Sequence, residues 1–161
     1  ERCRYDMAAV DALPERAVES FAGVANPFEL RALRPGERVV DLGAGAGTAS
    51  LLAGRAGGEP GSVIGNGRTA AMLDKATASI EAVGTPNVEF RHGYLEALPI
   101  DDGWADVLIP NGVINLGPDN TVVFDEAFRV LRPGGSLQFA DIANTREVPE
   151  GARREIDLWT G

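Results

Sequence analysis

The stretch VVDLGAGAGTAS, residues 39–50, decides how the rest of the chain is interpreted. It begins with apolar residues typical of a buried strand and continues into three glycines at alternate positions, Gly43, Gly45 and Gly47. A helical pattern follows at residues 46–56. Glycines between a strand and a helix allow bare backbone to come close to a ligand, because no Cβ intervenes. The stretch therefore predicts a ligand site at the end of a buried strand.

The same alternation of strand and helix continues along the chain. Apolar runs predict strands at residues 38–42, 62–65, 88–91, 105–109 and 136–140, and apolar periodicity predicts further helices at 70–83 and 119–131. Pro133-Gly134-Gly135 is predicted to end the last of these helices. Short strands that are apolar on both faces require a mostly parallel sheet with helices on both faces. Right-handed crossovers leave a few topologies open, and residues 39–41 are the natural central strand. Among these topologies we expect an α/β Rossmann-like fold of about five strands in the order 3-2-1-4-5, with its ligand where the order reverses.

The chain is predicted to form one compact unit. Its 161 residues, of which 44% are hydrophobic, suffice for a single core. Residues 1–35 show two short helical patterns separated by Pro14 and a helical turn at 28–33, which we interpret as an N-terminal helical flank or lid. Residues 36–161 then make up the Rossmann-like domain.

Charge and composition restrict the partners. The formal net charge of -9 argues against nucleic acid and anionic membranes, which attract clustered lysine and arginine. No apolar run approaches the roughly 20 residues that cross a bilayer, and the first residues lack the apolar region of a signal peptide. The single cysteine, Cys3, excludes an internal disulfide and a thiolate metal cluster. We expect a cytoplasmic protein with a small-molecule ligand and no metal.

The glycine spacing narrows the type of ligand. A dinucleotide fingerprint would place its third glycine at position 48, where this chain has Thr48. The positive end of the following helix suits a carboxylate group. Asp41, at the end of the strand, can accept hydrogen bonds either from a ligand ammonium or from amides of its own turn, and the sequence leaves both alternatives open.

At these residues the chain resembles the Rossmann-like, class I S-adenosylmethionine-dependent methyltransferases. The stretches NPFELRALRPGERVVDLGAGAG, GSVIG, EALPI, NGVINL and FRVLRPGGSL are similar to the arsenite methyltransferase branch in order and spacing, over about residues 20–160. The resemblance implies S-adenosylmethionine as cofactor and methyl transfer that depends mainly on proximity, so catalytic residues stay unassigned. It implies these cofactor-binding residues: Asp41, Gly43, Gly45, Gly47, Asn66, Gly67, Tyr94, Leu95 and Asn111.

Two positions depart from what the resemblance implies for the cofactor. Gly67 stands where the family has an acidic residue that accepts hydrogen bonds from the ribose hydroxyls, and this loss would weaken cofactor binding about ten- to hundredfold. Asn66 can substitute if the loop is shifted by one residue. Tyr94 stands where an acidic residue would lie near the adenine, and its ring can either stack on the adenine or fill the pocket.

The residues expected to bind the methyl acceptor also differ from those of the arsenite branch. The arsenite branch binds its substrate through cysteines, and this chain has Val24 and Gly112 at two of those positions. Arsenic(III) needs soft sulfur ligands, so we expect a small-molecule acceptor other than arsenite. Asn111 and Asn115 can orient a polar acceptor or simply cap their loop.

The sheet of the family has seven strands, whereas this sequence predicts five and a final helical run at 149–159. The strand at 136–140 would then lie at an edge with apolar faces partly uncovered, which predicts a homodimer through that side. The leading hypothesis is a methyltransferase acting on an unidentified small molecule. The alternative is a degenerate, non-catalytic protein of the same fold that serves as a binding or interaction module.

Overall fold

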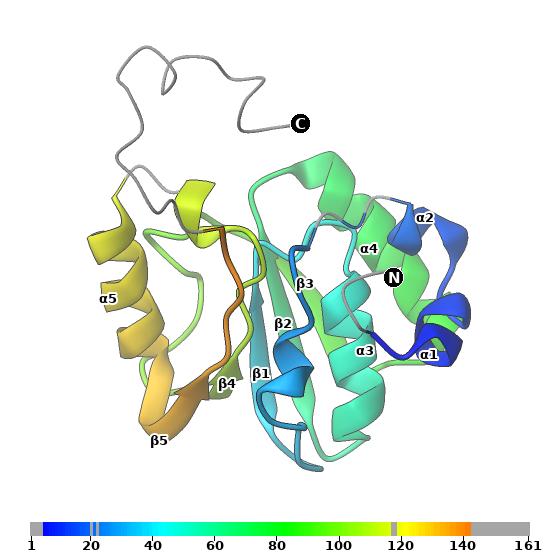
Figure 1. Cartoon of the computed structure of the whole chain (residues 1–161), viewed down its shortest axis with the longest axis horizontal. Helices are drawn as coiled ribbons and strands as arrows, with labels where there is room; N and C mark the ends of the chain where they lie inside the picture. The colour runs from blue at the N-terminus through cyan, green and yellow to red at the C-terminus, as the bar shows by residue number, and fades with distance from the viewer. Residues whose placement is uncertain (1–4, 20, 22, 117–118, 143–161) are drawn as a thin grey trace.

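A five-stranded parallel sheet forms the centre of the molecule. The computed structural model describes residues 5–19, 21, 23–116 and 119–142 of the 161. The strands are β1 (Arg38–Leu42), β2 (Ser62–Gly67), β3 (Val88–His92), β4 (Ala105–Leu108) and β5 (Leu131–Leu137). Their order is β3-β2-β1-β4-β5, and every neighbouring pair is parallel (Figure 1). The predicted fold class and strand order are confirmed.

Helices cover both faces of this sheet. Figure 1 shows α5 (Asn120–Val130) on one side and α3 (Thr48–Gly57) and α4 (Ala70–Val83) on the other. The short helices α1 (Met7–Asp11) and α2 (Glu15–Val18) lie beyond α3 and α4, as the predicted pair separated by Pro14. Single 3-10 turns, η1 (Pro27–Glu29) and η2 (Ile114–Leu116), complete the described elements. Among these, no helix has the length and apolar content needed to cross a bilayer.

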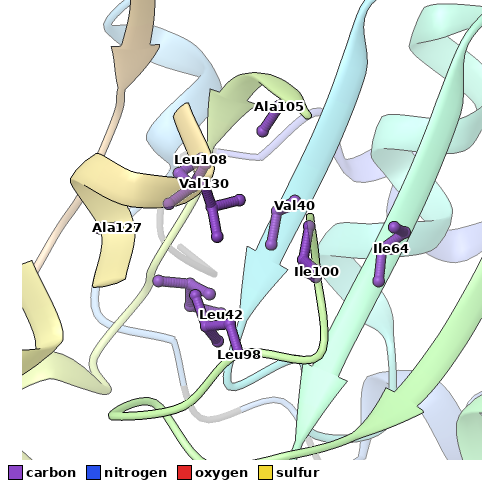
Figure 2. Packing of buried hydrophobic residues seen from close by; sticks show 9 residues of the cluster. All are labelled: Val40, Leu42, Ile64, Leu98, Ile100, Ala105, Leu108, Ala127 and Val130. Atoms are coloured by element: carbon purple, nitrogen blue, oxygen red, sulfur yellow. The ribbon is translucent and has the colours of Figure 1, made fainter. Parts of the chain in front are cut away.

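The core explains why β1 is the central strand. Successive side chains of a strand point to opposite faces, and Val39 and Val40 are both fully buried, one on each face. Figure 2 shows the cluster on the α5 side, which consists of Val40, Leu42, Ile64, Leu98, Ile100, Ala105, Leu108, Ala127 and Val130. On the other face, Val39 packs with residues of α3 and of the neighbouring strands. The ends of β1 are thereby held rigidly between two helical layers.

The N-terminal flank packs onto α3 and α4. Tyr5, Val10 and Leu13 share one buried cluster with Leu51 and Leu52 of α3. The Thr48 hydroxyl at the start of α3 donates a hydrogen bond to the Ala17 carbonyl over 2.7 Å. The flank is therefore continuous with the main core, and the domain boundary near residue 35 stays a prediction.

β5 differs from its prediction. The strand was expected at residues 136–140 after a turn, but it follows α5 directly and begins at Leu131. The Pro-Gly-Gly segment lies inside it as an irregularity, since Ala105 pairs with Leu131 and Val107 already pairs with Ser136. A Cβ on Gly135 would lie 3.0 Å from the Arg132 carbonyl oxygen, so this bulge needs a glycine.

The other predicted strands and the helices α3, α4 and α5 agree with the structure to within two residues at each end. The helical turn predicted at residues 28–33 is shorter in the structure, where η1 ends at Glu29. The final helical run predicted at residues 149–159 lies outside the described part of the chain.

Candidate functional site

Two adjoining cavities open at the carboxyl ends of the strands. The larger has a volume of about 440 Å³ and the smaller about 200 Å³. Both are lined by Gly43, Gly45, Met72, Val113 and Leu116. The position agrees with the expectation that a parallel α/β sheet binds its ligand where the strand order reverses, here between β1 and β4.

The glycine turn forms the wall between these cavities. Gly43, Gly45 and Gly47 have φ angles of 70°, 55° and 88°, in the left-handed region that favours glycine. A Cβ on Gly43 would collide with Val113, whereas a Cβ on Gly45 would have no neighbour closer than 4.0 Å. Gly45 thus presents bare backbone to both cavities. Gly47 lines neither cavity and instead caps α3 beneath Phe90.

Asp41 is buried between the turn and α3. Its side chain accepts a hydrogen bond of 2.6 Å from the Ser50 hydroxyl, and the residue is 2% exposed. Burial raises the pKa of the Asp41 carboxyl to about 7, although hydrogen bonds from the Ser50 side chain and backbone oppose the shift. Of the two roles that the sequence left open, the structure shows the internal one, which fixes the start of α3. Asp41 also lines the smaller cavity, and its contact with a ligand ammonium stays a prediction.

The end of β2 offers no carboxylate to a ribose. Gly67 pairs with His92 in regular register and lines the larger cavity, with only the Leu73 side chain near its missing Cβ. Asn66 pairs with Leu42, so the register shows no shift by one residue, and adjacent strand side chains face opposite ways. The Asn66 carboxamide is fully buried, and neither its oxygen nor its nitrogen has a hydrogen-bond partner in the described part of the chain. A ribose contact by Asn66 stays a prediction.

Tyr94 and Leu95 lie on the wall of the larger cavity. Tyr94 is 55% exposed and makes an edge-to-face contact with the His92 ring, at 6.1 Å between centroids. Its ring therefore leaves the cavity open. The His92 Nε2 atom donates to the Arg68 carbonyl over 3.0 Å, which gives this histidine a structural role.

Asn111 holds the N-terminal flank against the end of β4. Its Oδ1 accepts from the backbone amides of Val24 and Ala25 at 2.9 and 3.3 Å, and its Nδ2 donates to the Ala25 carbonyl at 2.7 Å. These contacts favour the loop-holding alternative, although Asn111 also lines the smaller cavity. They bring together Val24 and Gly112, the two positions where the resemblance implies cysteines. Asn115 lines neither cavity, and its buried Oδ1 is unpaired within the described residues.

Several lining residues were missed by sequence reasoning. In the larger cavity they are Arg68, Thr69, Met72, Leu73, Gly93, Val113 and Leu116, and the smaller cavity adds Phe21, Gly23, Ala44, Ala46, Thr48 and Ala49. The position of Arg68, directly after Gly67, was a usable signal. Helical spacing alone could not place Met72 at the cavity. In the part of the chain that the structure describes, no group of three or more His, Cys, Asp or Glu residues could hold a metal.

Methyltransferases are among the known proteins with similar sequences and folds. A family model described as a methyltransferase domain matches residues 33–160. The arsenite methyltransferase of Halobacterium salinarum is 39% identical over 161 residues, which cover 100% of this chain and 41% of that protein. The demethylmenaquinone methyltransferase of Lactococcus lactis is 35% identical over 102 residues, which cover 63% of this chain and 40% of that protein.

The crystal structure of an arsenic(III) S-adenosylmethionine methyltransferase from Chlamydomonas reinhardtii superposes with a TM-score of 0.85 at 37% identity. The match covers 94% of this chain and 53% of that one, so this chain spans about half the length of the proteins it resembles, or less.

These relatives imply S-adenosylmethionine as the cofactor, and the geometry fits it in part. The larger cavity and the bare backbone at Gly45 provide space and amides for an adenosyl amino acid, while Gly67 provides no acceptor for its ribose. The chain belongs to the class I S-adenosylmethionine-dependent methyltransferases and resembles their arsenite branch.

Proposed function

We propose that this chain forms the cofactor-binding core of a methyltransferase that acts on a small molecule. One observation carries the proposal: the glycine turn at Gly45 opens, without side chains, onto a cavity of about 440 Å³ at the carboxyl end of the central strand. The cofactor, when bound, would supply a methyl group on a sulfonium centre. The chain's own residues would bind and orient it and exclude water.

The division of the site supports distinct binding places for the two reactants. Gly67, Tyr94 and Leu95 of the larger cavity surround the space for the adenosine, and the glycine turn separates it from the smaller cavity. Val113 and Leu116 extend over both spaces with apolar side chains. Because methyl transfer of this kind depends on proximity and alignment, such walls can accelerate it without an acid or base residue.

The acceptor in this proposal is not arsenite. The smaller cavity is lined mainly by apolar residues such as Phe21, Ala46 and Ala49, and the adjacent Val24 and Gly112 supply no thiolate. Arsenic(III) requires soft sulfur ligands. Since arsenite methyltransferases are among the relatives, the distinction can be tested directly.

A second candidate function is a non-catalytic binding or interaction module. The absence of a ribose acceptor at Gly67 and of a carboxylate at Tyr94 favours it. A protein that has lost these groups can keep the fold while its affinity for the cofactor falls.

The proposal extends to location and partners. We infer a cytoplasmic location, and the net charge of -9 supports the lack of nucleic-acid and anionic-membrane partners. A homodimer is supported by exposed aromatic residues beside β5, with Phe128 83% exposed.

Calorimetric titration with S-adenosylmethionine and S-adenosylhomocysteine tests the two functions. Micromolar binding supports the enzyme, and no heat at millimolar ligand supports the non-catalytic module.

Gly67→Asp should tighten binding of the cofactor about tenfold or more, because a carboxylate can accept from both ribose hydroxyls and only the flexible end of Leu73 must move. Ala71→Asp places the same charge on α4 away from the cavity and should leave binding unchanged. Arsenite binding by the unaltered chain would overturn the acceptor assignment.

A further inference from the structure

Arg68 lines the larger cavity next to Gly67, the position at which the resemblance implies an acidic residue. Gly67 ends β2 without a side chain, and Arg68 and Thr69 continue the cavity wall from there towards α4. Within the described part of the chain, the Arg68 guanidinium makes no ion pair or hydrogen bond. Among the residues that line this cavity, Arg68 is the one basic side chain and Glu96 the one acidic side chain.

The backbone of Arg68 is fixed even though its side chain is unpaired. The Arg68 carbonyl accepts a 3.0 Å hydrogen bond from His92 at the end of β3, and this contact joins the two strand ends at the cavity rim. The backbone that carries the Arg68 side chain is therefore held in place next to Gly67, at the rim of the larger cavity. A Cβ at Gly67 would meet only the Leu73 side chain within 4 Å, with its Cδ2 atom at 2.9 Å, so the flexible end of Leu73 is the one group that must move to free the space at Gly67.

This arrangement reverses the hydrogen-bonding chemistry at the sugar. A carboxylate accepts hydrogen bonds from ribose hydroxyls, whereas a guanidinium only donates, and its planar fork matches a phosphate group. In related Rossmann folds, an acidic residue near the end of the second strand selects a free ribose hydroxyl, and an arginine nearby accommodates a ribose phosphate. Gly67 followed by Arg68 corresponds to the second arrangement. The Thr69 hydroxyl, which makes no capping hydrogen bond, offers a further donor on the same wall.

We propose that the larger cavity binds adenine nucleotides that carry a phosphate on the 2′- or 3′-hydroxyl of the ribose, with Arg68 holding the phosphate. The proposal rests on the proposed function only in placing the adenosine in this cavity with its sugar at the end of β2. Such nucleotides would compete with S-adenosylmethionine, because both occupy the same space. The cavity would then respond to a second class of ligand in addition to the cofactor.

Isomeric nucleotides test this proposal, because they have the same atoms and differ only in the position of the phosphate. We would titrate adenosine 2′-, 3′- and 5′-monophosphate, adenosine and S-adenosylhomocysteine into the protein by calorimetry. The 2′- or 3′-isomer should bind about tenfold or more tightly than the 5′-isomer and adenosine, the difference expected for one charge-assisted contact. The preferred isomer should also raise the apparent dissociation constant of S-adenosylhomocysteine.

Two variants assign the preference to Arg68. Arg68→Gln should abolish the preference for the 2′- or 3′-isomer while leaving adenosine binding and the circular dichroism spectrum unchanged. Lys75→Gln removes one positive charge from the exposed face of α4, outside the cavity, and should preserve the preference. If both variants lose it equally, the attraction is non-specific and the proposal is overturned.

The remaining outcomes also separate the two proposals. Equal binding of the three isomers overturns the inference. The inference also fails if Arg68→Gln weakens only the binding of S-adenosylhomocysteine, because Arg68 would then contact a ribose without a phosphate. A preference for the 2′- or 3′-isomer without binding of S-adenosylhomocysteine supports the inference and contradicts the proposed function. If no adenosine compound binds, both fail.

Discussion

Asp41 is a buried carboxyl whose ionisation opposes folding. Its pKa is raised to about 7 in the folded protein, chiefly because burial removes the charged form from water. In the unfolded chain the group ionises near 3.8. Between these values the folded state holds the proton and the unfolded state does not. The contribution of Asp41 to stability is therefore largest below about pH 4 and falls as the pH rises towards 7.

Asp41→Asn tests whether the ionisation of Asp41 lowers stability as the pH rises. The amide oxygen can still accept from the Ser50 hydroxyl, but it does not ionise. At pH 8 the variant should have a free energy of unfolding up to about 4 kcal/mol higher than the parent chain, and the difference should shrink towards pH 4. Urea unfolding at several pH values measures it. Ser50→Ala should move the loss of stability to higher pH, because the hydroxyl stabilises the carboxylate. The same pH slope in Asp41→Asn and the parent would contradict the explanation.

Asn66, near the end of β2, is a buried polar side chain that borders the larger cavity. Both carboxamide atoms are buried without hydrogen-bond partners in the part of the chain that is described, which costs about 1 to 3 kcal/mol. Asn66→Leu, similar in shape, should raise the free energy of unfolding by about 1 to 2 kcal/mol. The control is Asn87→Leu, because the Asn87 amide donates to the Gly54 and Gly58 carbonyls at 3.0 Å and its loss should destabilise. Similar destabilisation of both variants would refute this interpretation.

At the scale of elements, the bulge in β5 is a backbone feature that depends on a glycine. A Cβ at Gly135 would lie 3.0 and 3.1 Å from the carbonyl oxygens of Arg132 and Asp106, and backbone atoms within a sheet cannot move away easily. Gly135→Ala should lower the free energy of unfolding by about 1 to 3 kcal/mol. Gly57→Ala, in α3 with open space around it, should leave stability unchanged or slightly raised. Thermal unfolding of both variants provides the comparison, and an unaffected Gly135→Ala would contradict the role of the bulge.

The same elements show what the sequence can predict. β1 and α4 have the predicted bounds because a strand buried on both faces and an amphipathic helix leave clear local patterns. The start of β5 was wrong because Pro-Gly-Gly usually ends an element. Here the pairing with β4, distant in sequence, continues the strand through it.

The candidate site also contains some features that the local sequence predicts and others that it does not. The glycine turn and the lack of an acceptor at Gly67 follow from local sequence. The position of Arg68, directly after Gly67, is local information too. The positions of Met72 and Val113 around the cavities depend on how α4 and the segment leading into η2 pack over the strand ends, and this information is not local.

At the scale of the whole molecule, one apolar surface is left uncovered within the described residues. It is formed by four exposed residues of α5 and the segment after β5: Phe124, Phe128, Phe139 and Ile142. The rings of Phe124 and Phe139 contact each other edge to face, at 6.0 Å between centroids. β5 is also the edge of the described sheet, with one side of its backbone unpaired. A two-fold related copy can cover both features at once, since such an interface joins identical patches.

Light scattering at micromolar concentration should accordingly show a dimer, and Phe128→Ser should convert it to a monomer with an unchanged fold. Leu30→Ser, at a residue 67% exposed but distant in sequence from this surface, should leave the dimer intact. Because each copy carries a net charge of -9, association works against mutual repulsion, which salt screens. The dimer should therefore become tighter between low and physiological salt, as expected for an apolar interface and opposite to one held by ion pairs. A monomer in the parent chain, or a dimer that dissociates as salt is added, would contradict this assembly.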